Sequence, residues 1–196
     1  GLVGSEMCIR DSPYIDQEKL QPGTVNALFF HMMGSHGPAY AKRYPDKFNK
    51  WGPVCTNSDL RSCDPKSIRN AYDNSILYTD HVLSSMIDKL KAMKDADTAL
   101  IYMSDHGESL GEKGLFLHGA PYAIAPSEQT HIPMILWVSD GLRSRLGIAK
   151  GCLEACAKKP VSHDDLWSTV LALTQVKSST YNAKQDITAA CRKPSK

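Results

Sequence analysis

Three histidines and an aspartate in this chain lie in glycine-rich loops, where they could bind a metal ion or a phosphate group. Asp105 and His106 are adjacent, His118 follows twelve residues later, and His36 lies far upstream in Gly-Ser-His-Gly-Pro. Carboxylate oxygens and imidazole nitrogens are both good zinc ligands. A single loop histidine is usually a solvated surface residue. Three of them, each followed by glycine and one beside an aspartate, favour a metal or phosphate site over that interpretation.

Serine nucleophiles receive little support from the sequence. Ser35, Ser104 and Ser109 flank the histidines, but no Gly-x-Ser-x-Gly elbow is present. Serines in polar loops commonly form hydrogen bonds to nearby backbone groups. We therefore predict that these three serines are loop hydrogen-bonders and that the chain is not a Ser-His-Asp hydrolase.

Three apolar runs of strand length are expected to position these loops. Residues 25–33 predict a buried strand of a parallel sheet that ends directly before the loop of His36. Residues 98–103 predict a second strand, which ends directly before Asp105 and His106, and residues 132–139 predict a third. In open α/β sheets ligands bind beyond the carboxyl ends of the strands. The polar loops therefore lie where a site is expected.

Two helices are predicted between and after these strands. Asp64 is suited to be an N-cap and Pro65 to the first turn, and apolar residues at helical spacing continue the helix to about Met93. The sequence at 162–165 resembles a capping box with Asp165 in place of the usual glutamate, before an amphipathic helix. The order strand, helix, strand, strand, helix predicts an α/β sandwich.

The composition is that of an ordinary globular protein of one domain. The 196 residues are 42% hydrophobic and 22% charged, with 23 basic and 21 acidic residues and a net charge of +2. This balance, without a basic run, gives no argument for binding nucleic acid. No segment approaches the roughly 18 consecutive apolar residues of a membrane span.

Six cysteines leave several pairings open. Cys55 and Cys63 bracket a short polar loop, and this spacing fits a local disulfide and two unpaired thiols about equally well. Cys152 and Cys156 are four residues apart and could meet on one helical turn. No Cys-x-x-Cys pair is present, so a zinc ribbon or a thioredoxin motif is not expected.

The first twelve residues do not resemble the rest of the chain. Residues 1–12 look like translated sequencing-adapter read-through and lack the basic start and apolar run of a signal peptide. We treat residues 1–12, with Cys8, as non-native and expect the natural sequence to begin near Pro13.

The segment from Ser104 to Gln129 carries a family resemblance. Its Ser-Asp-His-Gly-Glu-Ser-Leu-Gly-Glu run, Leu-His-Gly at 117–119 and Pro-Tyr-Ala-Ile-Ala-Pro at 121–126 closely resemble the lipid A phosphoethanolamine transferases, which include the mobile colistin-resistance enzymes. The residues Gly34 to Tyr40, the start of the long helix and the tail near Arg192 are also similar to that family. The resemblance covers nearly everything from Val25 to Arg192.

The resemblance implies a three-layer αβα sandwich of the alkaline phosphatase and sulfatase type, incomplete in this chain, with residues 13–196 as the C-terminal part of a periplasmic catalytic domain. It implies Zn²⁺ bound by a glutamate, a nucleophilic threonine, an aspartate and a histidine, of which the last two match Asp105 and His106. His36 and His118 would line the site of the phosphoethanolamine group or of a second zinc, with Glu108 in the same pocket. Cys55 and Cys63 match a disulfide of the family.

The implied parent enzyme transfers phosphoethanolamine from phosphatidylethanolamine to a lipid A phosphate and gives polymyxin resistance. It is held in the bacterial inner membrane by N-terminal helices that this chain does not contain. The family's threonine nucleophile and first glutamate ligand also lie upstream, so we expect the isolated chain to be inactive. A phosphoglycerol transferase, or a sulfatase or phosphatase of the same superfamily, would share the Asp-His pair, but the longer Leu-His-Gly-x-Pro-Tyr-Ala block argues against these alternatives.

Overall fold

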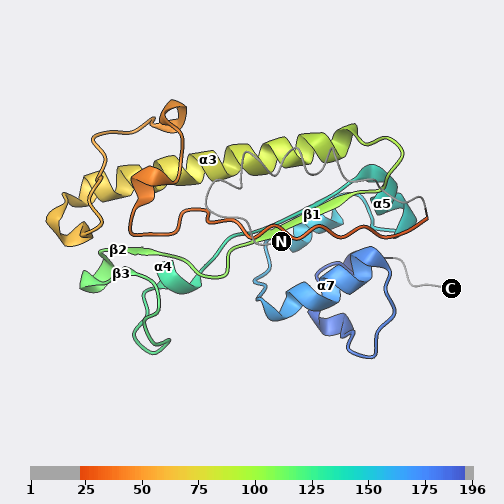
Figure 1. Ribbon diagram of the computed structural model, residues 1–196. Helices are drawn as coiled ribbons and strands as arrows, with labels where there is room; N and C mark the ends of the chain where they lie inside the picture. Colours follow the sequence, from red (N-terminus) through yellow and green to blue (C-terminus); the bar gives the residue numbers. More distant parts are fainter. Residues whose placement is uncertain (1–22, 193–196) are drawn as a thin grey trace. The chain divides into compact units, whose positions relative to one another are not determined.

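The computed structural model describes residues 23–192, which form two compact units (Figure 1). One unit contains the described residues up to Lys89 together with Met103–Met134, and the other contains Leu90–Tyr102 and the residues from Ile135 onward. Each unit has its own hydrophobic core. The interpretation of residues 1–12 as non-native concerns residues outside the described range.

The longest element of the first unit is the helix α3, Pro65–Ala92. A carboxylate oxygen of Asp64 accepts a hydrogen bond from the Ser67 N–H at 3.1 Å, and Pro65 occupies a first-turn position that needs no N–H donor. Both the N-cap and the predicted bounds are confirmed. The buried positions Ile68, Ala71 and Tyr78 recur at helical spacing and turn one face of α3 inward.

Short 3₁₀ helices and loops cover the N-terminal half of α3. They are η1 (Tyr40–Lys42), η2 (Asp46–Phe48) and η3 (Leu60–Ser62). Tyr40, Cys55 and Leu60 pack with Ile68 and Ala71 into one core cluster. The predicted disulfide between Cys55 and Cys63 is formed, and the Cys55 N–H donates to the Ser67 carbonyl at 3.0 Å. The disulfide loop is thereby joined to the start of α3.

Asn74 of α3 is the point at which the loop after η2 is anchored. Its side chain is fully buried, and its Oδ1 accepts hydrogen bonds from the N–H groups of Lys50 and Trp51, both at 3.0 Å. Its Nδ2 donates to the Asn49 Oδ1 at 3.0 Å, to the Trp51 carbonyl at 2.9 Å and to the Tyr44 hydroxyl at 3.1 Å. One buried amide therefore fastens residues 49–51 and Tyr44 to α3.

Residues 25–33 do not form the predicted strand. They are irregular and mostly exposed, with Phe29 85% exposed and Val25 58% exposed. A strand exists only through hydrogen bonds to a neighbouring strand. The sheets of the described part of the chain pair β1 with β4 and β2 with β3, and neither includes this segment. The apolar run was correctly found, but its prediction as a buried strand is wrong in this structure.

The strands β2 (Ser109–Leu110) and β3 (Phe116–Leu117) form a small antiparallel hairpin that the sequence did not predict. Ser109 pairs with Leu117 and Leu110 with Phe116. Leu110, Phe116 and Leu117 pack against the core cluster of Tyr40 and Ile68. The short helices η4 (Glu112–Gly114) and α4 (Ser127–Thr130) lie within the hairpin turn and after the following loop.

The two remaining predicted strands are confirmed as β1 (Ala99–Met103) and β4 (Met134–Val138). They pair with each other in antiparallel fashion. At one end the Ser139 N–H donates to the Thr98 carbonyl at 2.9 Å, and at the other the Ser104 N–H donates to the Pro133 carbonyl at 3.5 Å. Ser139 also caps the helix α5 (Asp140–Arg145) by accepting from the Leu142 N–H.

The helix predicted after residues 162–165 is α7, Asp164–Thr174. The Asp165 carboxylate accepts from the Ser162 N–H at 2.7 Å, which is the reciprocal bond of the predicted capping box. The rest of the second unit includes α6 (Cys152–Cys156), η5 (Ala183–Gln185) and η6 (Ala189–Cys191). Its core contains Val138, Leu142, Leu146, Ile148, Leu153, Leu173 and Cys191.

Cys152 does not pair with Cys156. It forms a disulfide with Cys191, 39 residues away, and Cys156 is a free thiol. Two cysteines one helical turn apart project in parallel from the same face, whereas Cys191 approaches that face from η6.

Among residues 23–192, no helix combines the length and the apolar character that crossing a bilayer requires.

We predict that Asn74→Asp lowers the free energy of unfolding by about 2–4 kcal/mol. The substitution keeps one acceptor oxygen but turns the donating amide into a second carboxylate oxygen, which faces carbonyl and hydroxyl oxygens in a buried place. Urea unfolding measures the change. Asp73→Asn, the inverse change at the exposed neighbouring position, is the control and should shift stability by less than about 0.5 kcal/mol. Equal effects of the two variants would contradict the anchoring role of Asn74.

Candidate metal centre

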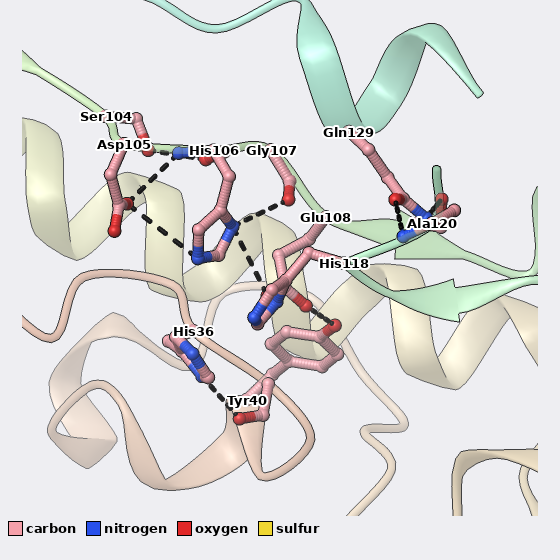
Figure 2. Close-up of polar contacts among 12 residues, drawn as sticks. His36, Tyr40, Ser104, Asp105, His106, Gly107, Glu108, His118, Ala120 and Gln129 are labelled. Atoms are coloured by element: carbon pink, nitrogen blue, oxygen red, sulfur yellow. Dashed lines mark hydrogen bonds and ion pairs between the residues drawn. The ribbon is translucent and has the colours of Figure 1, made fainter. Parts of the chain in front are cut away.

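His36, His106, Glu108 and His118 lie together in the first unit (Figure 2). Each offers a ligand atom, and these four atoms all lie within 4.8 Å of one another. The residues come from three segments: the loop before η1, the loop after β1 and the residue after β3. The structure therefore brings together three of the histidines predicted from the sequence with the glutamate implied by the family resemblance.

All three histidines have their Nδ1 atom engaged. The Nδ1 of His36 lies 2.7 Å from the Gly37 carbonyl, and that of His106 lies 2.9 Å from the Gly107 carbonyl. The Nδ1 of His118 lies 2.8 Å from the Glu108 carboxylate. Because carbonyl and carboxylate oxygens only accept, each Nδ1 is the protonated nitrogen and donates. Each Nε2 then keeps its lone pair, which is how metal-binding histidines are usually held.

Glu108 links two of the segments. Its side chain is only 5% exposed, and its two oxygens have different partners. Oε1 accepts from His118, and Oε2 accepts from the Tyr40 hydroxyl at 2.6 Å. Burial, and then the hydrogen bond to Glu108, raise the pKa of Tyr40 above its ordinary value. The hydroxyl therefore stays protonated as the donor.

Asp105 is placed at the edge of this group. Its carboxylate is 82% exposed and lies 3.8 Å from the Nε2 of His106. This separation is too long for a hydrogen bond. It is close to the roughly 3.3–3.5 Å that separates two ligands of one tetrahedral zinc ion. Asp105 and His106 thus remain together as a candidate ligand pair, on the side of His106 that carries its free lone pair.

The imidazole rings are in contact with one another. The rings of His106 and His118 stack with centroids 3.7 Å apart, and His36 meets His118 edge-on at 4.8 Å. The site thus consists of three neighbouring imidazoles, with Asp105 beside His106 and Glu108 beside His118. Imidazole nitrogens and carboxylate oxygens are the ligands that zinc prefers, so this donor set fits the ion that the sequence implied.

The glycines that follow the histidines are required by close packing at two positions. A Cβ atom on Gly107 would lie 1.9 Å from the Glu128 carbonyl oxygen, and the Gly107 N–H donates to the Gln129 carbonyl at 3.0 Å. A Cβ atom on Gly37 would lie 2.5 Å from a Leu117 methyl carbon and 2.9 Å from Glu108 Oε2. Only glycine therefore allows these segments to approach as closely as they do.

Leu117, directly before His118, has φ = 66°. A left-handed conformation is uncommon for a residue that is not glycine, and such residues concentrate at functional sites. Here the turn at Leu117 ends β3 and directs the chain so that His118 reaches Glu108.

Gln129 is a residue of the site that the sequence did not reveal. It is buried, its Nε2 donates to the Ser109 Oγ at 2.9 Å, and its Oε1 accepts from the Ala120 N–H at 3.2 Å. It therefore joins the segment after β1 to the segment after His118. Tyr40 ends the motif of Gly34 to Tyr40 that resembles the family, but the sequence predicts no role for its side chain. A single buried tyrosine or glutamine in a helix of one turn leaves no local pattern that would identify it.

The predictions for the three serines have different outcomes. The Ser104 hydroxyl donates to the His106 carbonyl at 2.6 Å and is a loop hydrogen-bonder as predicted. Ser109 accepts from Gln129, so it also forms a hydrogen bond, but it lies in β2 and not in a loop. The buried hydroxyl of Ser35 has no hydrogen-bond partner among the described residues, so that prediction is wrong for Ser35.

We predict that Tyr40→Phe lowers the free energy of unfolding at pH 8 by about 1.5–3 kcal/mol, because it removes a buried hydrogen bond to a carboxylate. The folded-state pKa of Tyr40 is raised, so its contribution is complete below the unfolded pKa of about 10 and declines above it. The difference between wild type and Tyr40→Phe should therefore shrink by about 1.4 kcal/mol per pH unit above pH 10. Urea unfolding at pH 8 and pH 10.5 measures it. Tyr122→Phe, at a 91% exposed position, is the control; a difference that grows with pH would contradict the role of Tyr40 as donor.

Two solved structures resemble this fold closely. The soluble domain of lipooligosaccharide phosphoethanolamine transferase A from Neisseria meningitidis matches with a TM-score of 0.80 and 46% sequence identity over 84% of this chain and 50% of that chain. The C-terminal periplasmic domain of the phosphoethanolamine transferase EptC from Campylobacter jejuni matches with a TM-score of 0.74 and 45% identity over 85% of this chain and 52% of that chain. These matches confirm the predicted α/β fold of the sulfatase type.

Curated proteins with similar sequences are also phosphoethanolamine or phosphatidylethanolamine transferases. The phosphoethanolamine transferase EptA of Salmonella typhimurium strain LT2 is 43% identical over 85% of this chain, and the phosphatidylethanolamine transferase Mcr-1 of Escherichia coli is 40% identical over 84% of it. The chain spans 31% and 29% of the length of these two relatives. The family model described as Sulfatase matches residues 13–176. The chain therefore belongs to the sulfatase family, and these relatives within the family are phosphoethanolamine transferases.

Proposed function

We propose that the whole protein transfers phosphoethanolamine from phosphatidylethanolamine to a phosphate of lipid A, with zinc bound at the candidate metal centre. The observation that carries the proposal is the set of three histidines whose Nδ1 atoms are engaged and whose Nε2 atoms are available, in a chain 43% identical to a phosphoethanolamine transferase. The name of the phosphatidylethanolamine transferase Mcr-1 supports the choice of donor, and a relative named for Kdo(2)-lipid A supports the choice of acceptor.

Asp105 and His106 would hold a zinc ion, together with the threonine and glutamate that we place in the part of the whole protein outside this chain. The ion supplies Lewis-acid stabilisation of negative charge on the phosphoryl oxygens. His36 and His118 would contact the phosphoethanolamine group or hold a second zinc. Both assignments rest on the family resemblance and on the separations in the site.

The chain's own residues bind, orient and manage protons. Phosphoryl transfer depends mainly on positioning and on neutralising charge, and the fixed imidazoles of His36, His106 and His118 are suited to both. His118 can accept a proton at Nε2 while the Glu108 carboxylate at Nδ1 stabilises the resulting imidazolium. Tyr40 holds the other oxygen of Glu108, so the carboxylate stays aligned with the imidazole.

We further propose that the site lies in the periplasm, on a protein anchored in the bacterial inner membrane, where the transfer would give resistance to polymyxins. Two disulfides within the described residues support an oxidising compartment. The periplasmic domain of the Campylobacter jejuni relative and the integral membrane transferase of Neisseria meningitidis support the location.

Zinc binding by the chain tests the ligand assignment. We predict that His106→Ala lowers the zinc affinity at least about 100-fold, because it removes a direct ligand. If His118 holds the second zinc, Glu108→Gln should lower the affinity for that ion about 10-fold, because it weakens the orientation of His118. Isothermal titration of the metal-free chain with zinc measures both. His131→Ala, at an exposed histidine outside the site, is the control and should leave the affinity unchanged. Full zinc affinity in His106→Ala would refute the assignment.

A chimera tests the transfer. Residues 24–192 of this chain are placed in the EptA of Escherichia coli K12, which is 43% identical, in exchange for its matching residues, and the chimera is expressed in cells that lack their own enzyme. Mass spectrometry of lipid A should show added phosphoethanolamine. The same chimera with His118→Ala should lose at least about 100-fold of this product, and His131→Ala should keep it.

The same experiment distinguishes a transferase from a hydrolase by the product that forms. Release of free phosphoethanolamine without modified lipid A would indicate a hydrolase. A folded, zinc-loaded chimera that neither transfers nor releases the group would sink the proposed function.

A further inference from the structure

Three cysteines of the second unit form a cluster that is separate from the candidate metal centre. Cys152 and Cys191 are joined by a disulfide, and the Sγ of the free Cys156 lies 3.5 Å from the Sγ of Cys191. All three sulfur atoms lie within 4.8 Å of one another. A free thiol so close to a disulfide is placed to attack it as a thiolate, because thiol–disulfide exchange begins with the attack of a thiolate on one sulfur of the disulfide.

The backbone holds Cys191 in front of the helix α6. The Ala149 N–H donates to the Cys191 carbonyl at 3.0 Å, and Ile148 pairs with Arg192 in an antiparallel bridge. Cys152 and Cys156 lie one turn apart on α6, so both side chains project from the same face toward Cys191. The sulfurs of both α6 cysteines therefore lie beside the sulfur of Cys191.

The three thiols differ in access. Cys191 is only 4% exposed and belongs to the hydrophobic core of the second unit, whereas Cys152 and Cys156 are half-buried at its edge. A reagent from solvent therefore meets the α6 cysteines before it meets Cys191.

We propose that Cys152, Cys156 and Cys191 form an internal thiol–disulfide exchange site. The Cys156 thiolate attacks the Sγ of Cys191, the Cys156–Cys191 bond forms, the Cys152–Cys191 bond breaks, and Cys152 leaves as a thiolate that takes up the proton released by Cys156. One disulfide and one thiol are present before and after, so the step needs no external oxidant or reductant.

Either of the two disulfides links the C-terminal segment at η6 to α6. The sequence separations of the two disulfides are 39 and 35 residues, so the entropy of closing the loop favours neither. Both forms join η6 to α6 and leave a half-buried thiol on α6, at 156 or at 152. Modification of the free thiol then traps one pairing without releasing Cys191 from the core.

Peptide mapping tests the exchange in the 196-residue chain with Cys8→Ser, which removes the cysteine outside the described residues. The chain is incubated at pH 8, quenched in acid, alkylated and digested without reduction. Cleavage after Glu154 is essential, because that residue separates Cys152 from Cys156. We expect disulfides of Cys191 with both partners, the Cys156–Cys191 form at about 10% or more of the total because loop closure favours neither pairing, and alkyl label at both Cys152 and Cys156.

Two variants give matched readouts. Cys152→Ser should form Cys156–Cys191 in nearly all molecules after air oxidation, and Cys156→Ser should show Cys152–Cys191 alone. The proposal is overturned if the Cys8→Ser chain carries label at Cys156 only, since this measurement needs no variant of the cluster. It is equally overturned if folded Cys152→Ser keeps Cys156 and Cys191 as two free thiols.

Discussion

The buried carboxylate of Glu108 is the interaction on which the candidate metal centre depends. A carboxylate that is 5% exposed is costly unless its oxygens are paired, and here one accepts from His118 and the other from Tyr40. These partners lie on different segments, so the same charge that orients the imidazole also holds the start of η1 against the β2–β3 hairpin. The close approach of Gly37 to Glu108 and Leu117 is possible because glycine leaves room for both. Loss of the carboxylate would therefore disturb the ligand and the loop together.

The elements that the sequence predicted correctly are those with local signals. α3 has an N-cap at Asp64, a proline in its first turn and a regular apolar face, and β1 and β4 are short apolar runs between polar loops. Residues 25–33 have the same apolar character, yet they remain exposed, because a strand also needs a neighbour and composition does not specify one. Contacts between residues far apart in the chain likewise determine two further features. They are the antiparallel pairing of β1 with β4 and the disulfide of Cys152 with Cys191.

The residues of the candidate metal centre also fall into those that the sequence predicted and those that it did not. His36, His106 and His118 were found because each is a histidine before a glycine in a loop, and the structure gives two of those glycines a steric reason. Asp105 was found through its neighbour His106. The sequence does not reveal Tyr40 and Gln129, because each contributes a hydrogen bond to a residue 68 or 20 positions away and nothing local distinguishes them from other buried polar residues. The sequence thus predicted the candidate ligands and, through the family resemblance, Glu108, but not the residues that hold Glu108 and its neighbouring segments in place.

The hydrogen-bond partners of the three imidazoles also suit them to different roles. His36 and His106 donate to backbone carbonyls, which are neutral acceptors that no side-chain substitution can remove. His118 donates to a carboxylate, whose negative charge makes the imidazole a better electron-pair donor and stabilises it when protonated. A histidine backed by a carbonyl is well suited to hold a cation or a phosphate oxygen in a fixed place. A histidine backed by Glu108 is suited to exchange a proton as well, so among the three it is His118 that best fits proton transfer during phosphoryl transfer.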